Sequence, residues 1–340
     1  MPQKVLITKD RCYFSASSFQ DCESITVEEG NPYFFRYNDY LFRKNDKTLL
    51  LACGNGELPP FTKVIGTYAF SKRTDLTEIT FPDFVHRIEY CAFQESSVES
   101  VTFSEKLSRI SFNAFAGCSR LRSIRFSSEL VSIGDEAFSD CTSLTDLVLP
   151  DSVTRIGCRA FQNCIGLESV QLPKHLPRIQ SGTFFNCAKL KKIEIPEDVS
   201  VIGRAAFAKC SALEYVKLGA NTQRIGELAF GQCEKLKKVE LPYGLKEIQD
   251  EAFYECKSLQ EIYIPSSVTK ITGCIFLCYG GHCPTIYSSK GSFAERYAKS
   301  HRYNFVAIEE NIEDNCCPHC HTELIKDAAF CHICGTKIER

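Results

Sequence analysis

Residues 133–155 read IGDEAFSDCTSLTDLVLPDSVTR, and the same pattern begins again at Ile156, 23 residues after its first start. The phenylalanine of this unit recurs through most of the chain, with every step 23 residues long except one of 22. Its ten positions are Phe70, Phe93, Phe115, Phe138, Phe161, Phe184, Phe207, Phe230, Phe253 and Phe276. The chain therefore repeats one structural unit in register.

A repeat of this length is typical of leucine-rich-repeat solenoids, in which each unit buries its apolar face against its neighbours. Within the unit, Leu147 and Leu149 alternate with polar positions as in a short strand, and Pro150 ends that strand because proline lacks a backbone donor. Ala160 and Phe161 are expected to return the chain on a short helical turn. We therefore predict an α/β repeat solenoid, a curved stack of about ten 23-residue units with short parallel strands.

Charge and hydrophobicity restrict the partners and the location. The formal net charge is −2 over 340 residues, so the whole-chain balance favours neither nucleic acid nor an anionic membrane. The first ten residues lack the apolar run of a secretory signal, and no segment approaches about 18 uninterrupted apolar residues. These features predict a cytoplasmic protein that binds neither nucleic acid nor membrane.

Twenty cysteines would indicate disulfides in a short secreted chain, but their placement favours another interpretation. Seven of them follow the repeat phenylalanine by three residues: Cys118, Cys141, Cys164, Cys187, Cys210, Cys233 and Cys256. A reactive thiol needs exposure and a cationic neighbour, whereas a free buried cysteine behaves as a small apolar residue. We therefore expect this cysteine ladder to be inert core.

The repeat consensus I-G-x-x-A-F-x-x-C-x-x-L-x-x-I-x-L-P-x-x-V is almost complete from Ile133 to Val153, and it resembles the BspA-like leucine-rich-repeat family. The resemblance covers about residues 12–308, and the segment GSFAERYAK at residues 291–299 is similar to the closing segment common in bacterial members. Members of that family are mostly known as surface adhesion and protein-binding proteins. The resemblance thus implies binding rather than catalysis.

The tail carries two cysteine pairs with metal-ligand spacing, Cys317 with Cys320 and Cys331 with Cys334, separated by ten residues. Two such pairs let four thiolates converge on one tetrahedral zinc ion, and the tail resembles short zinc-ribbon modules. We predict one structural zinc at these four residues. A thiol redox protein that uses the same pairs remains an alternative.

A second cysteine cluster follows the last repeat. It contains Cys274, Cys278, His282 and Cys283, which make a second metal site conceivable. No regular ligand pair appears among them, so we favour a loop in which Cys278 replaces the ladder cysteine one position early.

These signals divide the chain into five predicted segments. Tyr40–Phe42 and 48–51 flank a polar turn and predict a hairpin, while Ser292 and Glu295 form a capping box that opens a short helix. The segments are an N-terminal cap with a degenerate repeat and a hairpin at 1–60, repeats at 61–288, a capping helix and strand at 289–308, an acidic linker at 309–315 and the zinc ribbon at 316–340.

No phosphate loop, zinc-protease helix or nucleophile motif is found in the sequence, so we predict a non-catalytic protein-binding scaffold with the ribbon as a second docking module. An exported adhesin-type protein is a further alternative. Strand alternation leaves two outward columns along the repeats, and the second half of these columns carries lysines interleaved with tyrosines, which anchor interfaces well. The predicted partner-binding residues are Lys192, Tyr215, Lys217, Lys238 and Tyr263. Alternatively, Glu194, Lys217 and Glu240 form a solvated lattice of cross-strand pairs.

Overall fold

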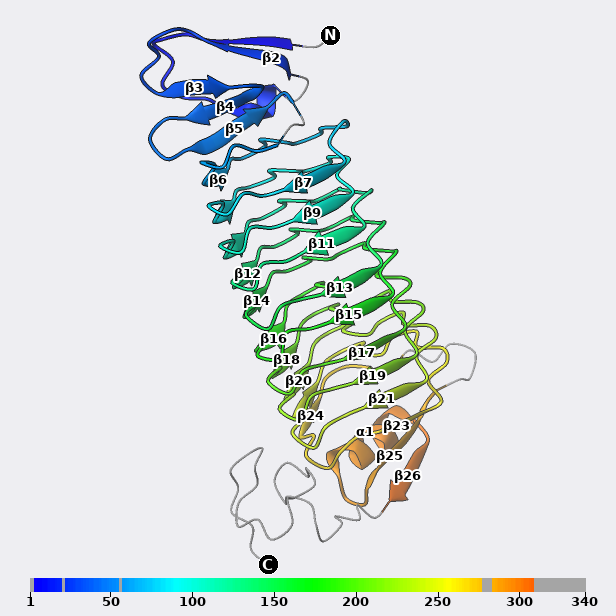
Figure 1. Cartoon of the computed structure of the whole chain (residues 1–340). Coiled ribbons are helices and arrows are strands. Elements are labelled where there is room, and N and C mark those ends of the chain that lie inside the picture. The colour runs from blue at the N-terminus through cyan, green and yellow to red at the C-terminus, as the bar shows by residue number, and fades with distance from the viewer. Residues whose placement is uncertain (1–2, 20–21, 55–56, 277–282, 309–340) are drawn as a thin grey trace, which may run out of the picture. The chain divides into compact units, whose positions relative to one another are not determined.

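The computed structural model describes residues 3–19, 22–54, 57–276 and 283–308, and the chain divides into two compact units, Met1–Pro173 and Lys174–Arg340. Each unit is a parallel-strand β-solenoid of leucine-rich-repeat type, with short strands stacked rung upon rung (Figure 1). The predicted solenoid is confirmed, but the α/β assignment is wrong. Across the described residues, one α-helix and one 3-10 turn, η1 (Ala16–Ser18), stand against many strands.

Unit 1 begins with strands that differ from the repeats. β1 (Gln3–Ile7) pairs in parallel with β2 (Cys22–Val27), and β3 (Phe34–Tyr37) begins an antiparallel group with β4 (Tyr40–Arg43) and β5 (Thr48–Ala52). The β4–β5 pair is the hairpin expected from the sequence. β5 then pairs in parallel with β6 (Val64–Ile65), which starts the regular rungs.

The rungs of unit 1 form two columns of parallel strands that lie on different sides of the coil (Figure 1). The two-residue column continues from β6 through β8 (Arg87–Ile88), β10 (Arg109–Ile110), β12 (Ser132–Ile133) and β14 (Arg155–Ile156). The three-residue column contains β7 (Glu78–Thr80), β9 (Ser100–Thr102), β11 (Ser123–Arg125), β13 (Asp146–Val148) and β15 (Ser169–Gln171). Equivalent repeat positions are neighbours, as in the pairing of Ile133 with Ile156.

Unit 2 repeats this plan. Its two-residue strands are β16 (Arg178–Ile179), β18 (Val201–Ile202), β20 (Arg224–Ile225), β22 (Glu247–Ile248) and β24 (Lys270–Ile271). Its three-residue strands are β17 (Lys192–Glu194), β19 (Tyr215–Lys217), β21 (Lys238–Glu240) and β23 (Glu261–Tyr263), after which β25 (Thr285–Ser289) and β26 (Phe305–Ile308) extend the β23 sheet.

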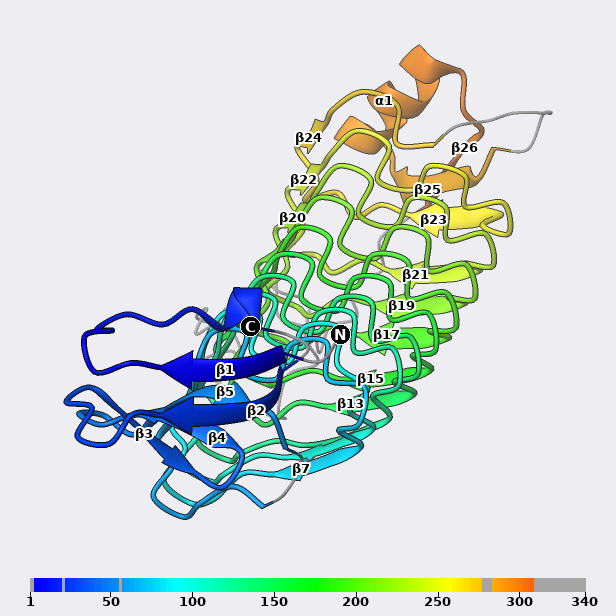
Figure 2. The ribbon, with the colours of Figure 1, turned by 90° about the horizontal axis from the view of Figure 1, so that it is seen from above.

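Helix α1 (Phe293–His301) covers the end of unit 2 beside β24 and β25 (Figure 2). The Ser292 hydroxyl accepts a hydrogen bond from the Glu295 N–H at 3.1 Å, so the cap predicted from the sequence is confirmed. Ala294, Tyr297 and Ala298 are buried on the inner face. Nowhere in the described ranges does a helix combine the length and apolar character needed to cross a membrane.

The return segment of each rung is not helical because its backbone bonds to the next rung. The Phe115 N–H donates to the Ala137 carbonyl, and the Phe138 N–H donates to the Ala160 carbonyl, both at 2.8 Å. Residues two before and two after the phenylalanine are left-handed, as at Glu136 (φ 54°) and Asp140 (φ 60°). A right-handed helix cannot contain such residues, so the predicted helical turn is replaced by a chain of tight turns.

The repeat phenylalanines form the core. In unit 1 the rings of Phe93 and Phe115 stack with centroids 4.7 Å apart and planes within 3°. In unit 2 the rings of Phe207 and Phe230 stack at 5.5 Å. Parallel offset stacking adds to the free energy gained from burial, so this ladder is the main source of cohesion between rungs.

The ladder cysteines have a second role that the sequence did not reveal. The Cys141 thiol donates to the Phe115 carbonyl at 3.3 Å, and the Cys233 thiol donates to the Phe207 carbonyl at 3.2 Å. The same bond joins Cys118, Cys164, Cys210 and Cys256 to the carbonyl of an earlier repeat phenylalanine. A buried carbonyl without a donor is costly, so cysteine both fills the small space and satisfies the backbone.

Burial raises the pKa of the Cys118, Cys164 and Cys256 thiols to about 12. We expect these thiols to resist maleimide at about pH 8 in the folded protein, while exposed Cys12 and Cys274 react within minutes. Mass spectrometry of labelled peptides measures this. Rapid native labelling of Cys164 would show that the ladder is accessible.

The same pKa values predict the pH dependence of stability. A thiol in the unfolded chain ionises at about pH 8.5, whereas the buried thiols of the folded protein keep their protons to a higher pH. The unfolded chain therefore binds fewer protons above that pH, and the free energy of unfolding should fall as the pH rises toward about 12.

A disulfide joins two of the described residues in the N-terminal strands, and the sequence pattern did not predict it. Cys22 in β2 is bonded to Cys53, which follows β5, with 5.2 Å between the Cα atoms. The bond ties the parallel β1–β2 pair to the antiparallel strands. Asn31 supports the same region, because its buried side chain accepts hydrogen bonds from the Tyr33 and Phe34 N–H groups.

Candidate functional site

The predicted partner-binding residues lie on the three-residue strands of unit 2. Register aligns Lys192 with Tyr215 and Tyr215 with Lys238 in the first column. The central residues of these strands are buried while the flanking ones face solvent, as the alternation predicted. We call Lys192, Tyr215, Lys217, Lys238 and Tyr263 the tyrosine–lysine face.

Lys238 is the hub of this face. Its ammonium lies 2.7 Å from the Glu240 carboxylate and 5.8 Å from the centroid of the Tyr215 ring. The hydrogen bond from Lys238 lowers the pKa of Glu240, and a further bond from Tyr215 acts in the same direction. Partial burial, followed by the hydrogen bond to Glu240, raises the pKa of Tyr215. Both groups thus keep their ordinary charge at neutral pH, and the tyrosine ring is held in place by the ion pair.

Tyr263 forms the second aromatic position. Its hydroxyl lies 2.7 Å from that of Tyr243, and the two ring centroids are 6.0 Å apart. Tyr263 also lines an open surface pocket of about 590 Å³ together with Lys238, Glu261 and Tyr287. This pocket lies where the β17–β19–β21 sheet ends and the β23–β25–β26 sheet begins. A protruding side chain of a partner could enter it.

Two lysines of the face are not held in close ion pairs by described residues. Within the part of the chain that the structure describes, neither Lys192 nor Lys217 makes an ion pair, although both are exposed. Glu194, Lys217 and Glu240 are aligned in register, and the charge of Lys217 helps to lower the pKa of Glu240, although the close ion-pair partner of Glu240 is Lys238 on its own strand. Lys217 and Glu240 thus interact across strands, as the alternative lattice predicts, but no close ion pair joins them among the described residues.

The equivalent face of unit 1 has a different character. Its columns carry Ser100, Ser123 and Ser169, and the Ser169 hydroxyl donates to Asp146 at 2.6 Å. Hydrogen bonds from Ser169 and Thr145 lower the pKa of Asp146. Small side chains such as these serines present little anchoring surface, and Ser169 is already bonded to Asp146. The contrast between the two units follows the contrast read from the sequence.

The sequence analysis missed Tyr243 and Tyr287 as members of the site. Tyr243 follows the strand proline outside both columns, and Tyr287 belongs to β25, beyond the regular repeats. The register pairs Tyr263 with Tyr287, so extending the column by one strand would have found the second residue.

The predicted zinc ligands Cys317, Cys320, Cys331 and Cys334 lie outside the described residues. In the ranges that the structure does describe, no group of three or more His, Cys, Asp or Glu side chains is placed to hold a metal ion. Of the suspected second cluster, Cys278 and His282 also lie outside, Cys274 is an exposed free thiol and Cys283 is disulfide-bonded. A bonded sulfur is not available as a thiolate ligand, which argues against that second site.

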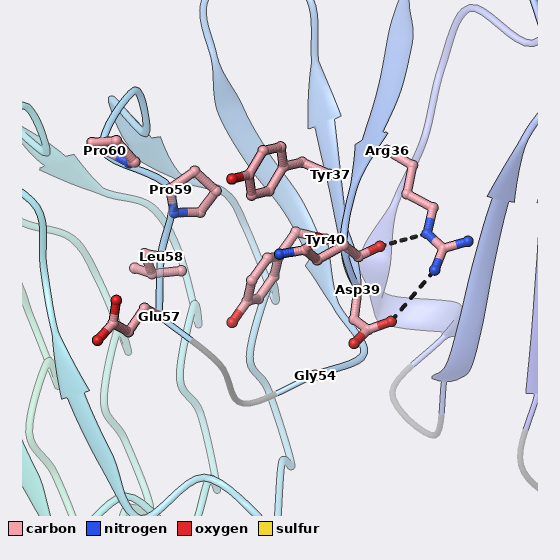
Figure 3. Close-up of a pocket in the computed structure, with 10 residues that line it drawn as sticks. Arg36, Tyr37, Asp39, Tyr40, Gly54, Glu57, Leu58, Pro59 and Pro60 are labelled. Atoms are coloured by element: carbon pink, nitrogen blue, oxygen red, sulfur yellow. Dashed lines mark hydrogen bonds and ion pairs between the residues drawn. The ribbon is translucent and has the colours of Figure 1, made fainter.

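Unit 1 has another hollow, of about 570 Å³, near its N-terminal strands (Figure 3). Its polar side chains are largely occupied with one another, since Arg36 pairs with Asp39 at 3.6 Å. Gly54 also lines the hollow, and a Cβ at this position would lie 2.8 Å from the Cβ of Asp39, so the two loops approach each other closely there. We regard this hollow as a consequence of two close loops rather than as the leading site.

Comparison with known proteins gives the family context. A family model described as a BspA type leucine-rich repeat region, in six copies, matches residues 53–168 and 154–280. No curated protein matches the sequence.

Several solved structures resemble the chain at low identity. A leucine-rich repeat protein from Bacteroides ovatus is 23% identical, with 81% of this chain and 97% of that chain covered and a TM-score of 0.43. A leucine-rich cell surface protein from Faecalibacterium prausnitzii is 22% identical, with 80% and 98% covered and a TM-score of 0.43. The pneumococcal vaccine antigen PcpA is 15% identical, with 81% and 98% covered and a TM-score of 0.45.

Proposed function

Because the chain belongs to the BspA-type leucine-rich repeat family, we propose that it is a non-catalytic scaffold that binds a protein partner through the tyrosine–lysine face. The observation that carries this proposal is the proximity of two exposed lysines, Lys192 and Lys217, which no described residue holds in a close ion pair, to two tyrosines fixed by hydrogen bonds. Tyrosines are enriched at the buried centres of protein interfaces, and charged side chains such as these lysines belong to the polar rim around them.

The arrangement also defines the chemistry of the partner. Its surface should offer carboxylates to Lys192 and Lys217, since both lysines lie on the exposed outer side of their strands. It should also project an apolar or aromatic side chain toward the pocket beside Tyr263. Such complementarity sets specificity and the rate of association more than the total affinity.

We expect the double substitution Tyr215→Ala with Tyr263→Ala to weaken partner capture by about tenfold or more, since interface tyrosines are frequent hot spots. For this measurement the full-length protein is immobilised, and the proteins that it captures are quantified by mass spectrometry. Both side chains are only partly buried, so the melting temperature should stay nearly unchanged.

The matched control is Ser100→Ala with Ser123→Ala, which changes two strand positions of unit 1 that are equivalent to that of Tyr215. Those substitutions should leave capture unaltered. If both double variants capture partners as well as the parent protein does, the interface is not on the tyrosine–lysine face.

We further propose that residues 316–340 form a structural zinc ribbon that acts as a second docking module. The support is the donor set, four cysteines in two closely spaced pairs, which suits tetrahedral zinc. Residues 311–340 carry five acidic and three basic side chains, a balance that does not suit binding to phosphate backbones. The thiol redox alternative requires the same cysteines to be free of metal, so metal content discriminates between the two.

Cellular location has two opposing indications. The sequence predicts a cytoplasmic protein, whereas the Cys22–Cys53 disulfide favours the exported adhesin-type alternative, because disulfides persist mainly in oxidising compartments. We retain the cytoplasm as the proposal, since zinc needs the tail cysteines as thiolates. Alkylation of intact cells before lysis should then label both Cys22 and Cys53, and recovery of the pair as a disulfide would support export.

A further inference from the structure

The two-residue strand column of unit 1 presents arginines to solvent. Strands β8, β10, β12 and β14, on one side of the coil (Figure 1), align Arg87, Arg109, Ser132 and Arg155 in register. Arg87 is neutralised by Glu89 at 2.7 Å. Arg109 and Arg155 are exposed, and among the described residues they make neither an ion pair nor a side-chain hydrogen bond. Two guanidinium groups are thus available on this side.

Apolar side chains are exposed beside these arginines. The exposed fractions are 55% for Tyr90, 40% for Phe112 and 48% for Val131. The rings of Tyr90 and Phe112 meet edge to face with centroids 6.1 Å apart. Together with Arg109 and Arg155, these residues line an open groove of about 570 Å³. Adjoining exposed apolar side chains rimmed by polar residues are typical of interaction sites.

We propose that this arginine–aromatic groove binds an extended acidic peptide whose carboxylates are three residues apart. Arg109 and Arg155 are separated by one rung, so their backbones lie about 10 Å apart at the usual strand spacing. A polyproline II helix makes one turn in three residues and rises about 9.3 Å in that turn. Carboxylates three residues apart therefore lie on the same side of the peptide, and each can reach one of the two arginines. A β-strand, with same-side residues about 6.8 Å apart, does not match this distance.

The residues between the two carboxylates then contact the apolar part of the groove. Phe112 follows Arg109 on its own rung and Val131 precedes the strand of the intervening rung, so a proline or leucine at that point covers them. Guanidinium groups bind carboxylates through two parallel hydrogen bonds, which gives geometric as well as electrostatic selectivity.

A nucleic acid strand fits the groove less well. Phosphate backbones are bound by many cations, whereas only two arginines among the described residues of the groove are unpaired. The carboxylates of Glu89 and Asp135 also line the groove and oppose any anion, but Glu89 is already paired with Arg87. Asp135 is fixed there by a hydrogen bond from the Cys158 N–H at 2.9 Å. An acidic peptide needs only the two arginines and the apolar surface.

The test is fluorescence anisotropy of a labelled peptide of repeated Glu-Pro-Leu units, titrated with the full-length protein. We expect saturable binding that Arg109→Ala with Arg155→Ala weakens by about 100-fold, since each lost charge-assisted pair removes about tenfold. Phe112→Ser should weaken it by about tenfold while leaving the circular dichroism spectrum unchanged. Arg109→Lys with Arg155→Lys should give an intermediate loss, because lysine keeps the charge without the planar fork.

Unit 2 offers a control with the same arginine spacing. Arg178 and Arg224 flank Val201 in register. Three residues after these two arginines lie Ser181 and Glu227, at the repeat positions that Phe112 and Cys158 occupy in unit 1. Substituting both of these arginines with alanine should change the affinity by less than about twofold. The proposal is overturned if the peptide does not bind, if this control loses as much affinity as the unit 1 variant, or if oligothymidine binds more tightly than the peptide.

Discussion

Replacing Phe115 with alanine should lower the free energy of unfolding by about 3–5 kcal/mol, the range measured for buried phenylalanines in other proteins. Phe115 is fully buried and stacks on Phe93 at 4.7 Å and on Phe138 at 5.2 Å, so its removal opens a cavity between three rungs. Neighbouring rungs cannot close this space without breaking their own inter-rung hydrogen bonds. Urea unfolding followed by circular dichroism gives the measurement.

Phe112 supplies an internal control, because it lies three residues earlier and is 40% exposed. Phe112→Ala removes the same atoms from a position that is partly hydrated already, so we expect a loss below about 1 kcal/mol. Similar losses for both variants would mean that the phenylalanine ladder does not carry the cohesion between rungs.

The sequence was sufficient to predict the rungs because every repeat position has one environment. Phe138 is buried, as is the equivalent phenylalanine of each neighbouring rung, and Leu147 faces the core because alternate strand residues point to the same side. The outward columns of the tyrosine–lysine face followed from the same alternation. Their register could be predicted because a shift by one residue would expose the buried residues of every strand.

The hydrogen bonding of the return segment could not be predicted in the same way. Ala137 and Phe138 are compatible with a helical turn, and only the neighbouring rung shows that their backbone groups are bonded sideways. The roles of the cysteines were hidden for a similar reason. Composition indicates that Cys141 is small and apolar, but not that a phenylalanine carbonyl from the previous rung needs its proton.

The junction between the N-terminal strands and the first rung breaks the repeat rule. Arg73 occupies the position that later rungs give to cysteine, and it is buried although charged. Its guanidinium donates to the Ala52 carbonyl at 2.9 Å and bonds to Asp75, whose pKa is lowered chiefly by that hydrogen bond. The arginine thus does for the strand end of β5 what the thiols do for phenylalanine carbonyls. No repeat pattern signals such a substitution, because it depends on a unique neighbour.

The largest effect should come from the tail. We expect reduced full-length protein to carry about one zinc per chain, and Cys317→Ser with Cys331→Ser to abolish it, because each substitution removes a thiolate from one pair. Binding of structural zinc by comparable modules is worth about 10–16 kcal/mol near pH 7, and it is folding free energy for the module. Affinity should fall as the pH is lowered, since protons compete for the thiolates. Plasma mass spectrometry of desalted protein gives the metal content.

Two comparisons separate this outcome from its rivals. Cys12→Ser with Cys274→Ser removes two exposed thiols and should leave the zinc content unchanged. Chelation should leave the strand signal in circular dichroism intact, because the described residues hold no metal cluster and each unit has its own phenylalanine core. Loss of the whole signal would contradict that independence. A metal-free tail in which Cys317 and Cys320 form a reversible disulfide would replace the structural ribbon by the thiol redox alternative, since a sulfur in a disulfide cannot serve as a zinc thiolate.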